Sequence, residues 1–203
     1  MVAVAALSAS AMSQLGPSEY LQTSDSPWAA SVGSSTFYLE NFEDGLLNSP
    51  GVTASEGSPI EPGVLTDSVD GDDGNVDGSG TAGRSFFFGG GATGIRFTFS
   101  SGTYGALPTH AGIVWTDGAG TTRFEAFDGN GNSLGVINGS HADGSFFGTT
   151  AEDRFYGWVN PGGIGSIHIS NSSGGIEVDH LQYEAVPEPA TMTVLGLGLA
   201  SLV

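Results

Sequence analysis

Ile95-Arg96-Phe97-Thr98-Phe99 is the stretch that decides the fold, because its apolar residues alternate strictly with Arg96 and Thr98. Successive side chains of a β-strand point to opposite faces of the sheet. The alternation therefore predicts a strand with one face in a core and the other face in water. Turn-forming residues bound the stretch on both sides, at Gly94 and at Ser100-Ser101-Gly102.

Other short apolar segments lie on both sides of this strand, divided by turns rich in Gly, Asn and Asp. They are Phe37–Glu40, Ala111–Trp115, Thr122–Phe127, Leu134–Ile137, Arg154–Val159, Ser166–Ile169 and Ile176–Tyr183. No segment between the two ends of the chain has helical spacing. The sequence therefore predicts an all-β domain over residues 36–185, an antiparallel β-sandwich of jelly-roll type. Residues 13–35 have no periodicity and predict a linker.

The last predicted strand changes face partway along. Ile176 and Val178 lie on one face, whereas Leu181 and Tyr183 fall on the other face if strict alternation continues. A β-bulge inserts one extra residue into a strand and shifts the alternation by one position. A bulge near Asp179-His180 would therefore bring all four apolar side chains to the core.

The first predicted strand shows the same slip, between Leu39 and Phe42. Matching slips at the two ends of the domain suggest that the first and last strands lie close together. Carboxylate oxygens are ligands that calcium prefers. The candidate calcium ligands are then Glu40, Glu43, Glu177 and Asp179.

A second, alternative calcium site is the acidic segment Asp70-Gly71-Asp72-Asp73-Gly74-Asn75-Val76-Asp77. Its candidate ligands are Asp70, Asp72, Asp73 and Asp77, on a Gly-rich loop that calcium could order. The spacing does not fit an EF-hand, because Gly74 stands at the fifth position and Thr81 at the twelfth. A solvated Asp/Gly turn explains the same residues without an ion.

Aromatic residues on the Arg154–Val159 strand indicate a carbohydrate surface as one interpretation. Tyr156 and Trp158 share one face, opposite Phe155 and Val159, so one set points away from the core unless both faces are covered. Exposed rings at Tyr156 and Trp158 would form a platform for a sugar ring. Core packing is the alternative interpretation.

The charge of the chain excludes some partners. The formal net charge is -18, because 22 acidic residues are opposed by only four arginines and no lysine. Such a chain repels phosphate backbones, so we expect no nucleic-acid partner. The absence of cysteine removes disulfides, thiolate catalysis and cysteine metal sites.

Both ends of the chain are apolar and predict helical segments. Residues 1–12 resemble the remnant of a signal peptide, with Ala9-Ser10-Ala11 as a cleavage-like site. Near the other end, Val186, Pro187, Glu188, Pro189 and Ala190 form a stiff spacer. Residues 191–203 after it are uncharged and shorter than the roughly 20 residues that span a bilayer.

Residues 186–203 resemble the PEP-CTERM sorting tail of bacterial secreted proteins. The family has Val-Pro-Glu-Pro-Ala, a short hydrophobic helix and a basic cluster; the first two are present here and the basic cluster is not. The resemblance implies transient anchoring in the inner membrane, processing by an exosortase-type enzyme, and a location at the cell surface or outside the cell. The rest of the chain looks like the sandwich ectodomains that often precede this tail, most of them without an assigned activity.

The expected function is therefore that of an exported, non-enzymatic protein of the cell surface or extracellular matrix. Calcium-dependent binding of an extracellular polysaccharide is a further expectation, because the plan is similar to carbohydrate-binding modules of jelly-roll type. A hydrolase or lyase acting on polysaccharide is the alternative. The G-x-S-x-G match at Gly131–Gly135 does not favour a serine hydrolase, because a strand and not a helix follows it.

Overall fold

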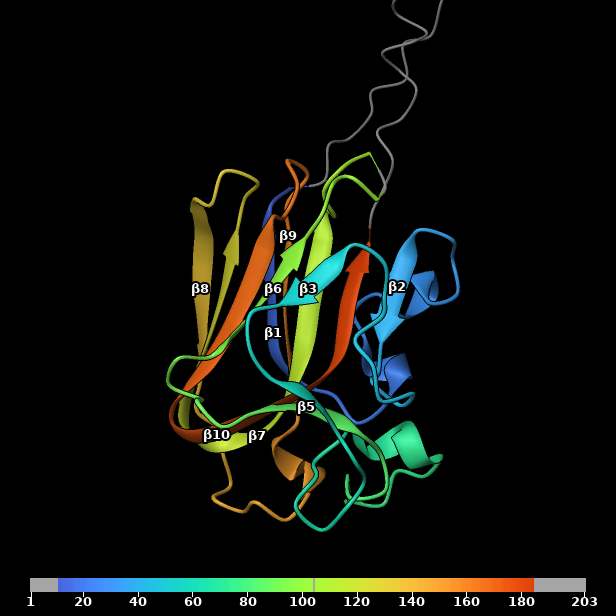
Figure 1. Ribbon diagram of the computed structural model, residues 1–203, viewed down its shortest axis with the longest axis vertical. Coiled ribbons are helices and arrows are strands. Elements are labelled where there is room, and N and C mark those ends of the chain that lie inside the picture. Colours follow the sequence, from blue (N-terminus) through green and yellow to red (C-terminus); the bar gives the residue numbers. More distant parts are fainter. Residues whose placement is uncertain (1–10, 104, 185–203) are drawn as a thin grey trace, which may run out of the picture.

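The computed structural model describes residues 11–103 and 105–184 (Figure 1). Within these two ranges the regular structure is ten β-strands and four short 3-10 turns, without an α-helix. The strands are β1 (Ser13–Glu19), β2 (Phe37–Glu40), β3 (Val52–Ala54), β4 (Ser58–Ile60), β5 (Ser85–Phe88), β6 (Ile95–Phe99), β7 (His110–Phe127), β8 (Ser133–Gly139), β9 (Arg154–Val159) and β10 (Ser166–Glu184). The turns are η1 (Thr23–Asp25), η2 (Ala29–Ser31), η3 (Asp70–Asp73) and η4 (Thr150–Glu152). The all-β prediction is confirmed.

Two long antiparallel strands, β7 and β10, run through the whole sheet side by side (Figure 1). The first half of β7 pairs with β9 and its second half pairs with β8. The first half of β10 pairs with β6, and its second half pairs with β5 and β2. The sequence predicted two separate strands in each of these segments. The halves stay joined because the glycine-rich middle parts pair through irregular register, with Ser173 opposite Ala119.

The two halves of the sheet pack against each other around one aromatic core. Phe99 of β6 lies with its ring centroid 5.1 Å from that of Tyr183, near the far end of β10. Phe124 in the second half of β7 stacks on Tyr156 of β9 at 6.0 Å. These contacts join residues from opposite halves, so the molecule is a sheet-rich sandwich. Burial of such large rings dominates the favourable free energy of folding.

The N-terminal segment covers the other face of the β9 side of the sheet. Strand β1 pairs with β9, and Trp28 lies edge-on to Phe155 with ring centroids 5.3 Å apart. Tyr20 is fully buried in the same second cluster. The prediction of a linker over residues 13–35 is therefore wrong, because this segment forms β1 and packs on the sheet. Strand β1 is exposed along nearly all its length, so its sequence lacks the alternation that marks a half-buried strand.

The predicted β-bulge in the last strand is confirmed. Between Asp179 and Gln182, β10 advances three residues while its partner β7 advances two, from Val114 to Gly112. His180 sits in the bulge with a positive φ of 42°. The apolar residues on both sides of the bulge join the main core, and they are Ile176, Val178, Leu181 and Tyr183. Phe42, where the first strand slips, also has a positive φ of 57° and is buried in this core.

Both predicted terminal segments lie almost wholly outside the described residues. This applies to residues 1–10 of the leader-like start and to the sorting tail at residues 186–203, including Val186–Ala190. In the part of the chain that the structure describes, no helix has the length and apolar character needed to cross a membrane.

Candidate metal centre

The bulged half of β10 carries acidic side chains on the face opposite the core. Glu177 and Asp179 alternate with core residues of the strand, so they point outward against the loop formed by residues 61–84. The backbone N–H of Asp67 donates to Glu177 Oε2 at 2.8 Å, and that of Val69 donates to Asp179 Oδ2 at 2.9 Å. Two strand carboxylates thus hold the loop over the sheet.

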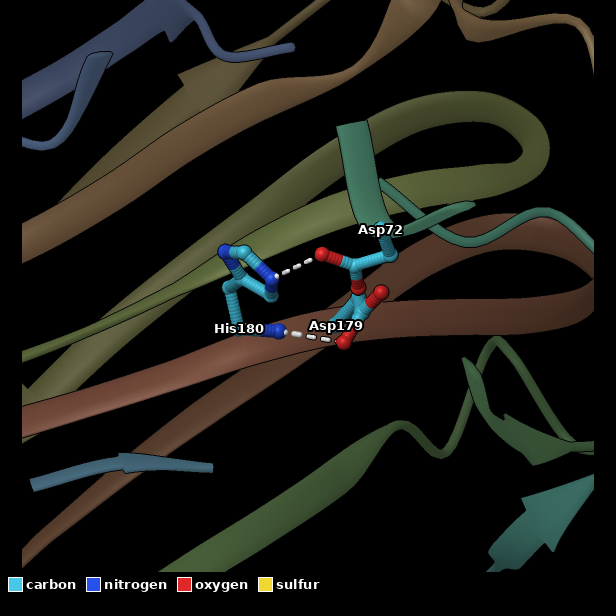
Figure 2. Close-up of side chains that lie close together, drawn as sticks. All are labelled: Asp72, Asp179 and His180. Atoms are coloured by element: carbon cyan, nitrogen blue, oxygen red, sulfur yellow. Dashed lines mark hydrogen bonds and ion pairs between the residues drawn. The ribbon is translucent and has the colours of Figure 1, made fainter. Parts of the chain in front are cut away.

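Asp72, Asp179 and His180 meet beneath this loop (Figure 2). One ligand atom from each of the three lies within 4.8 Å of the others, a spacing that suits a single metal ion. Asp72 comes from η3, whereas Asp179 and His180 come from the bulge in β10. The side chains are buried, with 8% of Asp72 and 1% of His180 exposed. A strained backbone at a buried polar cluster points to a functional role.

A chain of hydrogen bonds favours one tautomer of the neutral His180 ring. Ser26 Oγ donates to Gln182 Oε1 at 2.5 Å, so Gln182 Nε2 donates to Tyr20 Oη at 3.0 Å. Tyr20 Oη then has its own proton for His180 Nδ1, 2.9 Å away. This order leaves the imidazole proton on Nε2, which donates to Asp72 Oδ1 at 2.8 Å. His180 therefore orients Asp72, and a metal ion here is left with carboxylate oxygens as ligands.

The negative charge of this cluster is poorly compensated. Asp72 Oδ2 is buried and has no hydrogen-bond partner among the described residues. Burial raises the pKa of Asp179 well above its usual range, and the Asp72 carboxylate raises it further. Burial likewise raises the pKa of Glu43, which Asp72 also repels. The nearest arginine in the loop, Arg84, pairs instead with the exposed Glu61 at 2.5 Å. A divalent cation would supply the missing positive charge.

The first predicted ligand set is only partly brought together. The first and last strands do pair, with Glu40 opposite Leu181. Glu40, however, accepts the backbone N–H groups of Phe42, Asn48 and Ser49 at 3.2, 2.9 and 2.8 Å, so it closes the loop after β2. Glu43 accepts the N–H of Arg84 through one oxygen. Of this set, Asp179 belongs to the cluster, Glu177 holds Asp67, and Glu43 is close enough for Asp72 to raise its pKa.

The second predicted set contributes one ligand, Asp72. Asp70 is buried and accepts the N–H groups of Asp77 and Gly78, each at 2.9 Å, and the Thr150 hydroxyl at 2.7 Å. Asp73 is exposed and accepts the N–H of Asn75. Asp77 is exposed as well. The segment is a turn capped by its own first carboxylate, so the four acids do not converge on one point.

Further buried carboxyl groups lie in the loop and at η4, and no sequence pattern marks them. Asp67 in the loop, Glu152 in η4 and Asp153 just after η4 are each at most 2% exposed. Each has at least one carboxylate oxygen without a hydrogen-bond partner among the described residues. Burial raises the pKa of Asp67 to about 9 and that of Glu152 to about 8.

The predicted sugar platform is wrong. Tyr156 is fully buried and Trp158 is 3% exposed, because both rings lie in the core between the two halves of the sheet. Their neighbours Phe155 and Val159 are also buried, under the N-terminal segment. Both faces of β9 are covered, so neither pair offers a ring to solvent.

An exposed aromatic groove lies elsewhere, beside Asp117 and Glu177. Its volume is about 400 Å³, and its lining includes Phe87, Phe146, Asp117 and Glu177. Phe146 is 59% exposed and Phe87 is 39% exposed. Exposed aromatic rings beside a few polar groups are typical of ligand sites. These residues come from four separate segments, which is why no sequence pattern marks the groove.

No protein-family model matches this sequence, and no curated protein matches it significantly. Among solved structures, the chain is similar to the catalytic domain of a GH87 α-1,3-glucanase in complex with tetrasaccharides, at 18% identity and a TM-score of 0.39. It is also similar to the CBM22-1–GH10 modules of Clostridium thermocellum xylanase 10B, at 14% identity and a TM-score of 0.39. In these two cases 76% and 75% of this chain aligns with 29% of the other. Tailspike protein 4 of bacteriophage CBA120 gives 17% identity, a TM-score of 0.33, and coverage of 75% and 20%. Similarity at this level assigns neither an activity nor a ligand to this chain.

Proposed function

We propose that this chain is an exported, non-enzymatic protein of the cell surface or extracellular matrix, and that its jelly-roll sandwich binds calcium at Asp72 and Asp179. The observation that carries the calcium site is the unpartnered, buried Asp72 Oδ2 next to Asp179. A carboxylate left unpaired in the interior costs several kcal/mol unless it is protonated or meets a cation. The ion would fasten the loop of residues 61–84 to the last strand.

Calcium suits this site better than zinc. The hydrogen-bond chain through Tyr20 places the His180 proton toward Asp72, so the imidazole is a donor there and not a ligand. Calcium takes six to eight oxygen ligands in a flexible arrangement. Asp72, Asp179 and the neighbouring Glu43 supply carboxylates, and backbone carbonyl groups and water would complete the shell. Titration of the metal-free protein with calcium, magnesium and zinc tests the preference for calcium over zinc, with magnesium as a second hard cation.

The proposal that the protein is exported rests on the two terminal segments of the sequence. Residues 186–203 resemble a sorting tail, and residues 1–12 resemble a leader. The proposed partners are the inner membrane, transiently, and an exosortase-type enzyme. We expect cell fractionation of a host with such an enzyme to place the full-length protein at the surface or in the medium.

The matched variant for this prediction replaces Pro187, Glu188 and Pro189 together with alanine. Because the spacer is the part that resembles the recognition signature, this variant should accumulate in the membrane fraction without processing. A second variant, with Asn48→Ala inside the domain, should sort normally. Recovery of the unchanged protein from the cytosol would contradict the export proposal.

Carbohydrate binding is a second candidate function, and the groove at Phe87 and Phe146 favours it. A sugar ring can place its C–H face on an aromatic ring while its hydroxyl groups bond to carboxylates such as Asp117. We expect Phe146→Ala to lower the retention of a bound glycan at least tenfold, because Phe146 exposes a large ring at the groove. A glycan array probed in calcium with the unchanged protein and with the Phe146→Ala variant measures the difference in retention.

Leu46→Ala is the control, since Leu46 is 55% exposed and does not line the groove. If the unchanged protein retains no glycan with calcium or with chelator, carbohydrate binding is excluded. If the array or a reducing-end assay detects cleaved sugar that disappears in Asp117→Asn, the non-enzymatic proposal is wrong. Asp117 and Glu177 are cross-strand neighbours, so they are the pair to examine for such an activity.

A further inference from the structure

Two of the four arginines of this acidic chain lie on the outer face of the sheet, over β6, the first half of β10 and the second half of β7. Arg96 in β6 lies opposite His168 in β10, and His168 lies opposite Glu125 in β7. Arg123 is two positions before Glu125, so it shares this face. We call these four residues the arginine face. The residues that alternate with them belong to the main core, and they are Ile95, Phe97, Phe124, Ala126, Ile167 and Ile169.

Arg96 is a cation without a carboxylate partner. Its Nη1 donates to the hydroxyl oxygen of Ser166 at 2.9 Å, and its guanidinium carbon lies over the Phe127 ring, 4.2 Å from the centroid. No acidic side chain among the described residues forms an ion pair with it. A guanidinium placed over an aromatic ring keeps N–H groups at its edge for two parallel hydrogen bonds to a carboxylate.

The charges at the arginine face leave one positive charge in excess. Arg123 Nη2 lies 2.7 Å from Glu125 Oε2, and the Ser133 hydroxyl donates to Glu125 Oε1 at 2.6 Å, so the Glu125 carboxylate is neutralised within the face. Burial lowers the pKa of His168 from its ordinary 6.5, so the imidazole is neutral at pH 7. The charge of Arg96 remains uncompensated.

The other two arginines are engaged in local contacts. Arg84 pairs with Glu61 at 2.5 Å, and Arg154 donates to the backbone carbonyl groups of Ala151 and Asp153 at 3.0 and 2.7 Å. Neither contact involves a residue of the arginine face. The positive charge that is available to an anion therefore lies at the arginine face.

A hydroxyl-lined cavity of about 510 Å³ adjoins Arg96. Its lining includes Ser166, which accepts the Arg96 N–H, and Thr98, the next outward residue of β6. Leu107 adds an apolar side chain. The carboxylate in the lining, Asp128, accepts backbone N–H groups of its own turn at 2.8 Å. Hydroxyl groups beside an apolar side chain suit a sugar ring, so the cavity offers room for a sugar next to the guanidinium.

We infer that the arginine face binds an acidic polysaccharide, with a uronate carboxylate on Arg96 and its sugar ring in the adjoining cavity. Arg123 lies across two strand spacings, about 10 Å, and would contact another unit of the same polysaccharide. At physiological salt, charges more than about 8 Å apart are largely screened, so the local arginines outweigh distant acidic residues. The inference goes beyond the calcium site and the groove at Phe87 and Phe146, and it depends on neither.

Titration calorimetry with tetragalacturonate, in buffer with calcium, tests the inference. The unchanged protein should bind tetragalacturonate and should not bind its methyl ester, in which every carboxylate is neutral. Arg96→Gln should weaken binding about tenfold, because it removes the charge and the forked donor. Glu125→Gln should strengthen binding severalfold, since it removes the carboxylate that repels the ligand. Arg84→Gln is the matched control, because it removes the same charge from another loop and should bind normally.

Two results with tetragalacturonate would overturn the inference. One is the absence of binding. The other is equal binding by the unchanged protein and Arg96→Gln, which would indicate calcium ions bridging two acidic molecules. Equal affinity for the methyl ester, or for a single-stranded oligonucleotide of the same charge, would also overturn it, because the site would then not select a uronate.

Two further variants keep the test decisive. If Arg96→Gln does not fold, Glu125→Gln decides, because a damaged fold does not raise affinity and glutamine still accepts from Arg123 and Ser133. Phe146→Ala should bind tetragalacturonate as tightly as the unchanged protein, since Phe146 does not line the cavity beside Arg96. A loss of binding in Phe146→Ala would place the uronate in the other groove and overturn the inference.

Discussion

Adding calcium to the metal-free protein is expected to raise its melting temperature by about 10 °C. A ligand present at about 1,000 times its dissociation constant stabilises the native state by about 4 kcal/mol. For a chain of this size, 1 kcal/mol shifts the melting temperature by roughly 2–4 °C. The ion does this by removing the repulsion between the buried carboxylates of Asp72 and Asp179. Calorimetry in chelator and in millimolar calcium measures the shift.

The Asp72→Asn variant should gain much less stability from calcium than the unchanged protein does. Asparagine keeps an oxygen for the His180 N–H and lacks the charge that attracts the ion. In chelator the variant should be at least as stable as the unchanged protein, because it has one fewer buried charge. Asp73→Asn, in the same loop, should respond to calcium normally. Equal calcium shifts in all three proteins would argue against the site.

The stability of the metal-free protein is expected to fall by several kcal/mol as the pH rises from about 5 to 8. Burial raises the pKa of Glu177 to about 8, from an ordinary value of 4.5, and raises that of Glu152 to about 8 as well. Between the unfolded and folded pKa values, the native state binds more protons than the unfolded state. The free energy of unfolding therefore decreases with pH, by about 1.4 kcal/mol per unit for each such group.

The stabilisation from each of these two glutamates is fully present below its pKa in the unfolded chain. It is lost as the pH rises to its pKa in the folded protein, so the free energy of unfolding should stop falling above pH 8 to 9. Urea unfolding in chelator at several pH values measures it. Glu177→Gln should show a shallower fall and be more stable than the unchanged protein at pH 8, since glutamine cannot ionise and still accepts the N–H of Asp67. Glu56→Gln, at an exposed position, should leave the slope unchanged. A flat profile for the unchanged protein would refute the prediction.

The sequence predicted the structural features that leave a pattern in a few neighbouring residues. The alternation in Ile95–Phe99 located β6, because only one of its faces is buried. The break in alternation after Val178 located the bulge at His180, since a single inserted residue is the least change that keeps Leu181 in the core. Both are consequences of the two-residue period of a strand.

The features that depend on distant contacts could not be predicted. The polar strand β1 is an edge strand that is stabilised by pairing with β9 and has no apolar face of its own. Asp72 and Asp179 were assigned to two alternative calcium sites, because nothing local shows that η3 crosses over the bulge. Asp67 and Asp153 are single acidic residues in turns, and only the folded loop reveals that their oxygens lack partners.

Strand β10 lies where a force applied at the C-terminal end of the described residues would enter the sheet. It is hydrogen-bonded to four other strands, β2, β5, β6 and β7. A pull on the C-terminal end of the described chain acts along its length, while the ladder hydrogen bonds lie across it. Such a pull loads many bonds in shear at once instead of unzipping them singly. Force applied at this end would therefore be resisted together by the ladders that join β10 to β2, β5, β6 and β7.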